Sequence, residues 1–106
     1  MDRQGDETAT RLFLVERYWP GIDLVTLRPV LGRLDAAARA MRAEGAPVEH
    51  VGSILMPVDE VVFSLIAARD EGLVRELNER AGLPVDRITV AISLSSAPNP
   101  TGGLTP

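Results

Sequence analysis

Few residues in this chain carry side chains that could do chemistry. The single imidazole is His50, and the hydroxyl of Ser53 follows three residues later. The carboxyl of Glu16 stands in an apolar run, next to the aromatic pair Tyr18 and Trp19. An imidazole can act as a base or a ligand, a carboxylate can bind a metal or accept a proton, and aromatic rings can stack on a flat ligand. These five residues are the predicted ligand-binding residues.

Each candidate also has a structural interpretation. A lone histidine on a mostly apolar strand is often a hydrogen-bonded core residue, and this applies to His50. Glu16 can form an ion pair with Arg17 or Arg87 that fixes the register of a dimer. The two aromatic residues can close the open end of a core. Both interpretations stay open for His50, Glu16 and the aromatic pair.

Composition excludes several classes of site. The chain has no cysteine, so it has no disulfide, no thiolate metal site and no cysteine nucleophile. All eleven basic residues are arginine, which excludes a catalytic Schiff-base lysine and a P-loop lysine. The serines lie in no GxSxG motif, and the glycines form neither GxGxxG nor a Walker pattern. A net charge of -4 disfavours nucleic acid and anionic membranes as partners. We expect a cytoplasmic protein.

The first two elements that must position these residues are a strand and a helix. The run RLFLVERYW over residues 11–19 is rich in β-branched and aromatic residues and predicts a strand. Apolar residues at three- and four-residue spacing then predict a helix that begins at Leu27 after a Thr26 N-cap. This helix admits Pro29 in its first turn and ends at Gly45.

The second half of the chain predicts a hairpin, a helix and a last strand. Two apolar stretches, 48–56 and 61–67, are separated by four loop residues, which suits a β-hairpin. Asp70 can cap a helix that ends at Gly82. Alternation over residues 87–95 predicts a fourth strand.

The order βαββαβ is typical of an α+β ferredoxin-like sandwich, with a four-stranded antiparallel sheet and both helices on one face. We expect one such domain over residues 11–95, a flexible N-terminus over 1–10 and a disordered C-terminal tail over 96–106.

The strands are too apolar for one sheet face to stay in water. In the first strand, Leu12 and Leu14 alternate with Phe13 and Val15, so both faces carry apolar side chains. The usual cover for such a face is a second copy of the chain, and a ligand cavity can lie between the two sheets, as in a dimeric α/β barrel. The sequence therefore predicts a homodimer. Simple alternation in the second strand places His50 on one face with Val48, Gly52, Ile54 and Met56.

Three strings in the sequence carry a resemblance to a known family. LFLVERYWPG, PVEHVGSIL and RELNERAGLPVDRI are similar to segments of the small nickel-binding, ferredoxin-like domain family, whose members are mostly of unknown function. The similarity runs from Leu12 to Val90, and its most specific parts are VER and AGLPVDRI. It implies the ferredoxin-like fold, a dimer, a functional role for Glu16 and nickel as a possible metal.

This chain departs from the family pattern at the metal-binding positions. The family's second strand carries a tryptophan, then a histidine two residues later and then a serine. Here Ser53 keeps the serine, but the histidine position is Gly52. A second family histidine falls on Leu77, and the third strand, which carries tyrosine or cysteine in the family, reads VVFSLIA. We therefore expect no cofactor, with nickel disfavoured.

Three functions remain open on the sequence alone. The first is a dimeric binding domain for a small molecule, or less readily for a nickel-type ion. The second is a cofactor-free enzyme of the monooxygenase, cyclase or isomerase type, with Glu16 or His50 as its base. The third is a structural or interaction domain.

Overall fold

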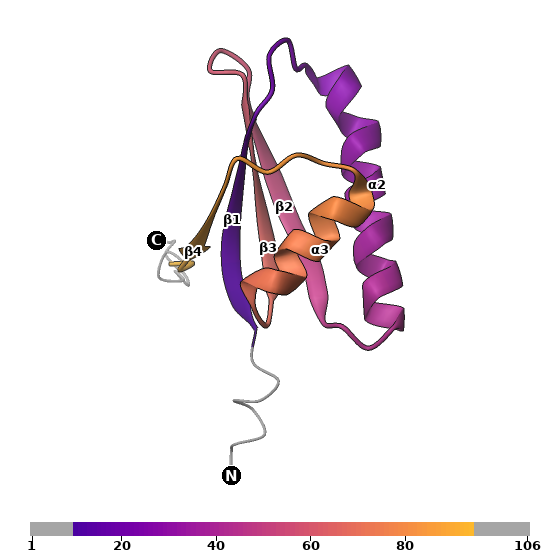
Figure 1. Ribbon diagram of the computed structural model, residues 1–106. Coiled ribbons are helices and arrows are strands. Elements are labelled where there is room, and N and C mark those ends of the chain that lie inside the picture. The colour runs from indigo at the N-terminus through magenta and orange to yellow at the C-terminus, as the bar shows by residue number, and fades with distance from the viewer. Residues whose placement is uncertain (1–9, 95–106) are drawn as a thin grey trace, which may run out of the picture.

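The computed structural model describes residues 10–94 as one βαββαβ unit. Its elements are β1 (Arg11–Tyr18), α2 (Leu24–Ala43), β2 (Val48–Met56), β3 (Val61–Ala68), α3 (Glu71–Ala81) and β4 (Arg87–Ala91). The strands form one antiparallel sheet in the order β2-β3-β1-β4. Both helices lie on the same side of this sheet (Figure 1). The predicted ferredoxin-like α+β fold is confirmed.

The core lies between the sheet and the helices. In β1, Phe13 and Val15 are buried on the helix side, while Leu12 and Leu14 point to the other side and are only half-buried. The helices contribute a matching apolar face, with Leu27, Val30, Leu34, Ala38 and Met41 from α2 and Val74, Leu77 and Ala81 from α3. The face of the sheet that carries no helix is called the open face below.

Helix α2 begins earlier than the sequence pattern predicted. The structure starts it at Leu24, and Asp23 rather than Thr26 is the N-cap, because the Asp23 carboxylate accepts a 2.8 Å hydrogen bond from the Thr26 amide. Leu24 and Val25 are exposed, so the added turn contributes nothing to the apolar periodicity. Pro29 consequently lies in the second turn and not in the first.

Helix α3 and the hairpin follow the sequence closely. Asp70 caps α3 by accepting from the Leu73 amide at 3.0 Å, and Gly82 ends the helix with a φ of 71°, a conformation that favours glycine. Strands β2 and β3 have the predicted hairpin arrangement. Glu60 in their loop fastens the hairpin to the end of β1, accepting from the Trp19 amide at its carbonyl and from the Gly21 amide at its carboxylate.

Three strand ends differ from the prediction. Trp19 lies just outside β1, which ends at Tyr18, and β3 extends by one residue to Ala68. β4 ends at Ala91, well before the predicted end at residue 95, which itself lies outside the described residues. Beyond Ala91 the apolar side chains of Ile92 and Leu94 are exposed, so their burial does not stabilise a longer strand. The expected flexible ends over 1–10 and 96–106 fall almost wholly outside residues 10–94.

Neither helix has the length and apolar character needed to cross a lipid bilayer, as judged for residues 10–94.

Candidate functional site

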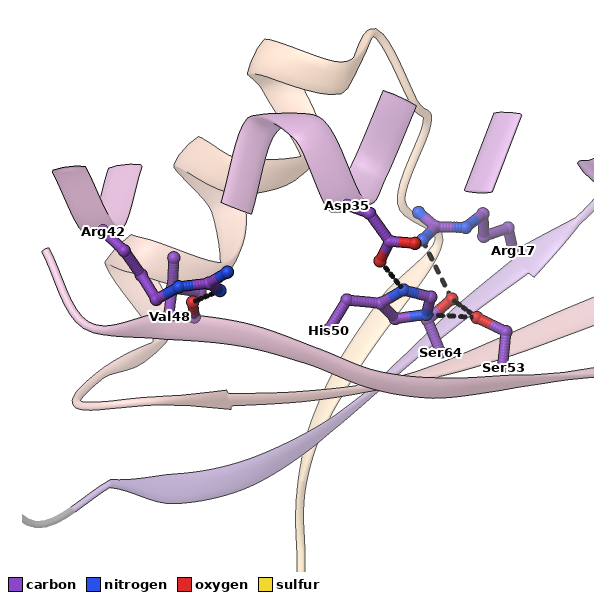
Figure 2. A network of polar contacts seen from close by, with 7 residues as sticks. All are labelled: Arg17, Asp35, Arg42, Val48, His50, Ser53 and Ser64. Atoms are coloured by element: carbon purple, nitrogen blue, oxygen red, sulfur yellow. Dashed lines mark hydrogen bonds and ion pairs between the residues drawn. The ribbon is translucent and has the colours of Figure 1, made fainter. Parts of the chain in front are cut away.

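A chain of six polar side chains runs through the space between the sheet and the helices. We call it the polar chain: Asp35 on α2, His50 and Ser53 on β2, Ser64 on β3, Arg17 on β1 and Asn78 on α3. It links five of the six elements of the fold. Figure 2 shows five of these residues, with the side chains of His50 and Ser53 directed toward each other from β2 and Asp35 above the imidazole ring.

Short contacts connect the members at every step. The Nδ1 atom of His50 lies 2.7 Å from an Asp35 carboxylate oxygen, and its Nε2 atom lies 2.7 Å from Ser53 Oγ. Ser53 Oγ lies 2.7 Å from Ser64 Oγ. These distances are typical of good hydrogen bonds.

Arg17 and Asn78 lie in the buried part of the polar chain. The Nη2 atom of Arg17 donates to Ser64 Oγ at 3.2 Å, and its Nη1 atom donates to Asn78 Oδ1 at 2.6 Å and to the Pro84 carbonyl at 3.0 Å. Asn78 in turn donates to the Val74 carbonyl at 2.7 Å. Among residues 10–94, the direct partners of this guanidinium are all neutral oxygens.

The burial of this arginine has an electrostatic consequence. Arg17 is only 1% exposed. Desolvation lowers its pKa to about 10, and the negative charge of Asp86 partly opposes that shift. The side chain remains protonated at neutral pH, so the polar chain has a fixed cation in its buried part.

A bulge in β2 decides which residues face the helices. His50 pairs with Ile66 but Gly52 pairs with Leu65, so Val51 is an extra residue in the ladder. After this bulge the alternation is reversed. Ser53 therefore shares the helix side with His50, although residues three apart on a regular strand point to opposite faces.

The bulge makes one sequence prediction wrong. His50 and Val48 do share a face, but Gly52, Ile54 and Met56 lie on the open face and not beside His50. Val51 is apolar and fits plain alternation, so nothing in the sequence indicates the extra residue.

The five predicted ligand-binding residues fall into three places. His50 and Ser53 come together on the helix side, 2.7 Å apart. Glu16 and Tyr18 lie on the open face, so the sheet separates them from His50. Trp19 packs against the core from the end of β1, which matches its structural interpretation.

The alternative pairing of Glu16 with Arg17 is wrong, because Arg17 faces the helices and binds Asn78, Pro84 and Ser64. Arg87 does lie directly opposite Glu16 in the register of β1 and β4. No ion pair within residues 10–94 joins these two side chains.

Sequence patterns did not identify four members of the polar chain as site residues: Asp35, Ser64, Arg17 and Asn78. Two of them are polar residues at positions where the sequence pattern predicts a buried apolar side chain. Arg17 continues the alternation of Phe13 and Val15 into the core, and Asn78 stands next to Leu77 on the apolar side of its helix. Asp35 lies on the polar face of its helix, as most charged helix residues do, and no sequence pattern distinguishes it as a site residue.

The open face presents apolar side chains from neighbouring strands. Ile54 is 54% exposed and Met56 is 40% exposed on β2, and Tyr18 at the end of β1 is 62% exposed. Leu12, Leu14, Phe63 and Leu65 form the half-buried centre. Gly52 interrupts this surface, since a Cβ atom built there would meet nothing within 4 Å.

The described residues do not fit a nickel site. His50 is the single histidine, and both of its ring nitrogens already have partners within the chain. Within residues 10–94, no three histidine, aspartate or glutamate side chains gather as a metal ion would require.

Two hollows on the surface of the domain are small. One of about 190 Å³ is lined by Arg75, Asn78, Glu79, Leu83 and Val85, and one of about 120 Å³ lies near Arg42 and Pro47. Typical sites for small organic ligands are larger, at about 300 Å³ or more. Asn78 is the one member of the polar chain that lines either hollow.

Comparison with known proteins supports the fold. No family model matches the chain, and no curated protein matches it. The crystal structure of SCO4226 from Streptomyces coelicolor A3(2) is similar, with a TM-score of 0.66 and 21% sequence identity. The match covers 80% of this chain and 99% of that protein. At this identity the likeness shows the shared fold alone.

Proposed function

We propose that this protein is a small-molecule-binding domain that acts as a homodimer, with the open faces of two sheets packed together and the ligand held between them. The observation that carries the proposal is the exposure of Ile54, Met56 and Tyr18 on a face that no helix covers. Extended apolar surfaces on a soluble domain usually mark an interface, because apolar area in water costs free energy.

A second copy of the chain suits this face because its charges are self-complementary. Glu16 and Arg87 lie side by side in the register of β1 and β4, at the margin of the apolar surface. A two-fold axis through the face places Glu16 against the partner's Arg87, and the reverse contact forms at the same time. The pairing adds electrostatic specificity to an apolar contact.

Space for a ligand is expected near Gly52. This glycine leaves a gap beside Leu65 on the open face, and Ala67, the next open-face residue on β3, is also small. Two facing copies enclose both gaps, and the two-fold axis brings a second pair of gaps from the partner. The lining is aliphatic and aromatic, so the ligand class is a small apolar or aromatic molecule.

Native mass spectrometry and light scattering of the full chain test the association. We expect about twice the chain mass of 11.4 kDa, with any retained ligand visible as an added mass. Ile54→Glu places a charge in the interface and should give monomers. Val58→Glu in the hairpin loop, which is 94% exposed, is the matched control and should remain dimeric. A wild-type monomer at micromolar concentration would contradict the proposal.

Ligand binding is tested separately with the fluorescent probe 1-anilinonaphthalene-8-sulfonate. Gly52→Leu fills the gap without backbone strain, because the φ of Gly52 is not in the left-handed region. We expect this variant to stay dimeric and to lose at least about tenfold in probe affinity, which corresponds to roughly 1.4 kcal/mol. Equal probe binding by the wild type and Gly52→Leu would show that the ligand does not lie between the sheets.

A further inference from the structure

Asp35, His50 and Ser53 are arranged in the order that activates a serine hydroxyl. The carboxylate lies at Nδ1 of the imidazole and the hydroxyl lies at Nε2, each at 2.7 Å. In acyl-transfer sites a serine gives its proton to one ring nitrogen while a carboxylate on the other orients the ring. This arrangement lies on the helix side of the sheet and is independent of the open face.

Arg17 fixes the hydrogen-bond direction at its own contact with Ser64. A guanidinium can only donate, so Ser64 Oγ accepts from Arg17. Ser64 then has its own proton to donate, and its remaining described contact is Ser53 Oγ at 2.7 Å. In the orientation where Ser64 donates to Ser53, Ser53 donates to His50 Nε2 and His50 Nδ1 donates to Asp35. In this orientation Nε2 is the ring nitrogen that accepts the serine proton.

Transfer of the Ser53 proton to His50 is favoured electrostatically at both ends. The imidazolium that forms lies against the Asp35 carboxylate. The oxygen left on Ser53 accepts from Ser64, which itself accepts from the cationic Arg17. The imidazolium therefore faces an opposite charge directly, and the oxyanion faces one through Ser64. The His50 side chain is only 8% exposed, so solvent screens these interactions weakly.

We propose that Ser53 is the nucleophile of an acyl-transfer site for small activated esters, with His50 as its general base and Asp35, Ser64 and Arg17 as positioning residues. Ser53 Oγ forms a bond to the carbonyl carbon, and the bond from that carbon to the leaving oxygen breaks. His50 carries the serine proton to the leaving oxygen, which departs as an alcohol. A water molecule then gives its proton to His50 while its oxygen bonds to the acyl carbon. The bond from that carbon to Ser53 Oγ breaks, His50 returns the proton to Oγ, and the acid leaves.

The position of β2 provides a route to the site. This strand is an edge of the sheet, so Ser53 has a neighbouring strand on only one side. Ser53 is partly exposed, and the Asp35 side chain at the outer end of the polar chain is 49% exposed. On this proposal a small ester reaches the partly exposed Ser53 from the outer edge of β2.

The test is labelling of the full chain with a fluorophosphonate, in which Ser53 Oγ bonds to phosphorus and fluoride leaves. Mass spectrometry of the digested protein should place the adduct on Ser53. His50→Gln should lower the labelling rate at least about a hundredfold, the usual minimum contribution of a general base. Ser93→Ala, which changes an exposed serine after β4, should label as the wild type does.

Asp35→Asn separates a catalytic arrangement from a structural one. Asp35 is an exposed helix residue, so this variant should fold with an unchanged circular dichroism spectrum. An amide can present its N–H to Nδ1, which turns the ring proton toward Ser53 and removes the base. The labelling rate and its pH profile should both change while the fold does not. An unlabelled Ser53 in the wild type, or equal labelling rates in wild type and His50→Gln, would overturn the proposal.

Discussion

His50 Nε2 lies 2.7 Å from Ser53 Oγ although the two residues are three apart on one strand. The contact exists because Val51 is an extra residue in β2. It lies between His50 and Gly52, which pair with the consecutive β3 residues Ile66 and Leu65. Deleting Val51 would leave His50 and Ser53 two apart on a regular strand, which still places them on one face.

We therefore expect deletion of Val51 to be tolerated, with a change in the free energy of unfolding within about 1 kcal/mol. Deletion of Ile54 is the matched control. It shifts Leu55 and Met56 by one residue and moves Leu55 from the helix side to the open face, at a cost on the order of 2–3 kcal/mol. Urea unfolding measures both. If the two deletions lower the free energy of unfolding equally, the extra residue at Val51 does not determine which face the later residues of β2 occupy.

Arg17→Met should destabilise the protein strongly. The methionine fills much of the space, but Asn78 Oδ1, the Pro84 carbonyl and Ser64 Oγ lose their donor in a buried region. We expect a loss of about 3 kcal/mol, because an unsatisfied buried acceptor costs about 1–3 kcal/mol. The exposed Arg28→Met on α2 is the control and should be near neutral. Guanidinium unfolding that gave the same midpoint for both variants would show that the polar chain adds nothing to stability.

The ion pair between the two helices predicts a dependence of stability on pH. The Arg80 guanidinium donates to both carboxylate oxygens of Glu44, at 2.7 and 2.9 Å, and these hydrogen bonds lower the pKa of Glu44 below its ordinary value of 4.5. A lowered folded-state pKa stabilises the protein above the ordinary value, and this contribution is lost as the pH falls through the folded-state pKa.

Glu44→Gln should therefore lower the melting temperature at pH 7 and have no effect at a pH well below 4.5. Glu49→Gln, an exposed carboxyl on β2, should have little effect at either pH. Thermal melts across this pH range measure the difference. A gap between wild type and Glu44→Gln that stayed constant down to the lowest pH would exclude the carboxylate as its cause.

Exchanging the charges of Glu16 and Arg87 on the open face should change the strength of the dimer in a predictable way. Under the proposed two-fold packing, Arg87→Glu sets two carboxylates against each other and should weaken the dimer at least about tenfold. The combined Glu16→Arg, Arg87→Glu swap should restore it. Sedimentation equilibrium gives the dissociation constants, and thermal melts of each variant control for effects within one chain. An unchanged constant for Arg87→Glu would remove these charges from the interface.

Local residue patterns were sufficient to predict the elements and their order. Apolar spacing identified both helices, alternation identified the strands, and Asp70 and Gly82 marked the two ends of α3 correctly. These features depend on residues only a few positions apart in the chain, so the sequence predicts them directly. The start of α2 was missed because Leu24 and Val25 are exposed and the cap is made by Asp23.

The polar chain was decided by tertiary structure. Its members come from five elements, and the contact between Arg17 and Asn78 spans 61 residues of sequence. The sequence determined that a histidine, a serine and an apolar surface exist on these strands. Only the packing of α2 over β2, together with the bulge at Val51, brought Asp35, His50 and Ser53 to one place and left Glu16 on the opposite face. Side chains distant in sequence meet only when backbone register and helix placement are fixed together, and no local pattern contains that information.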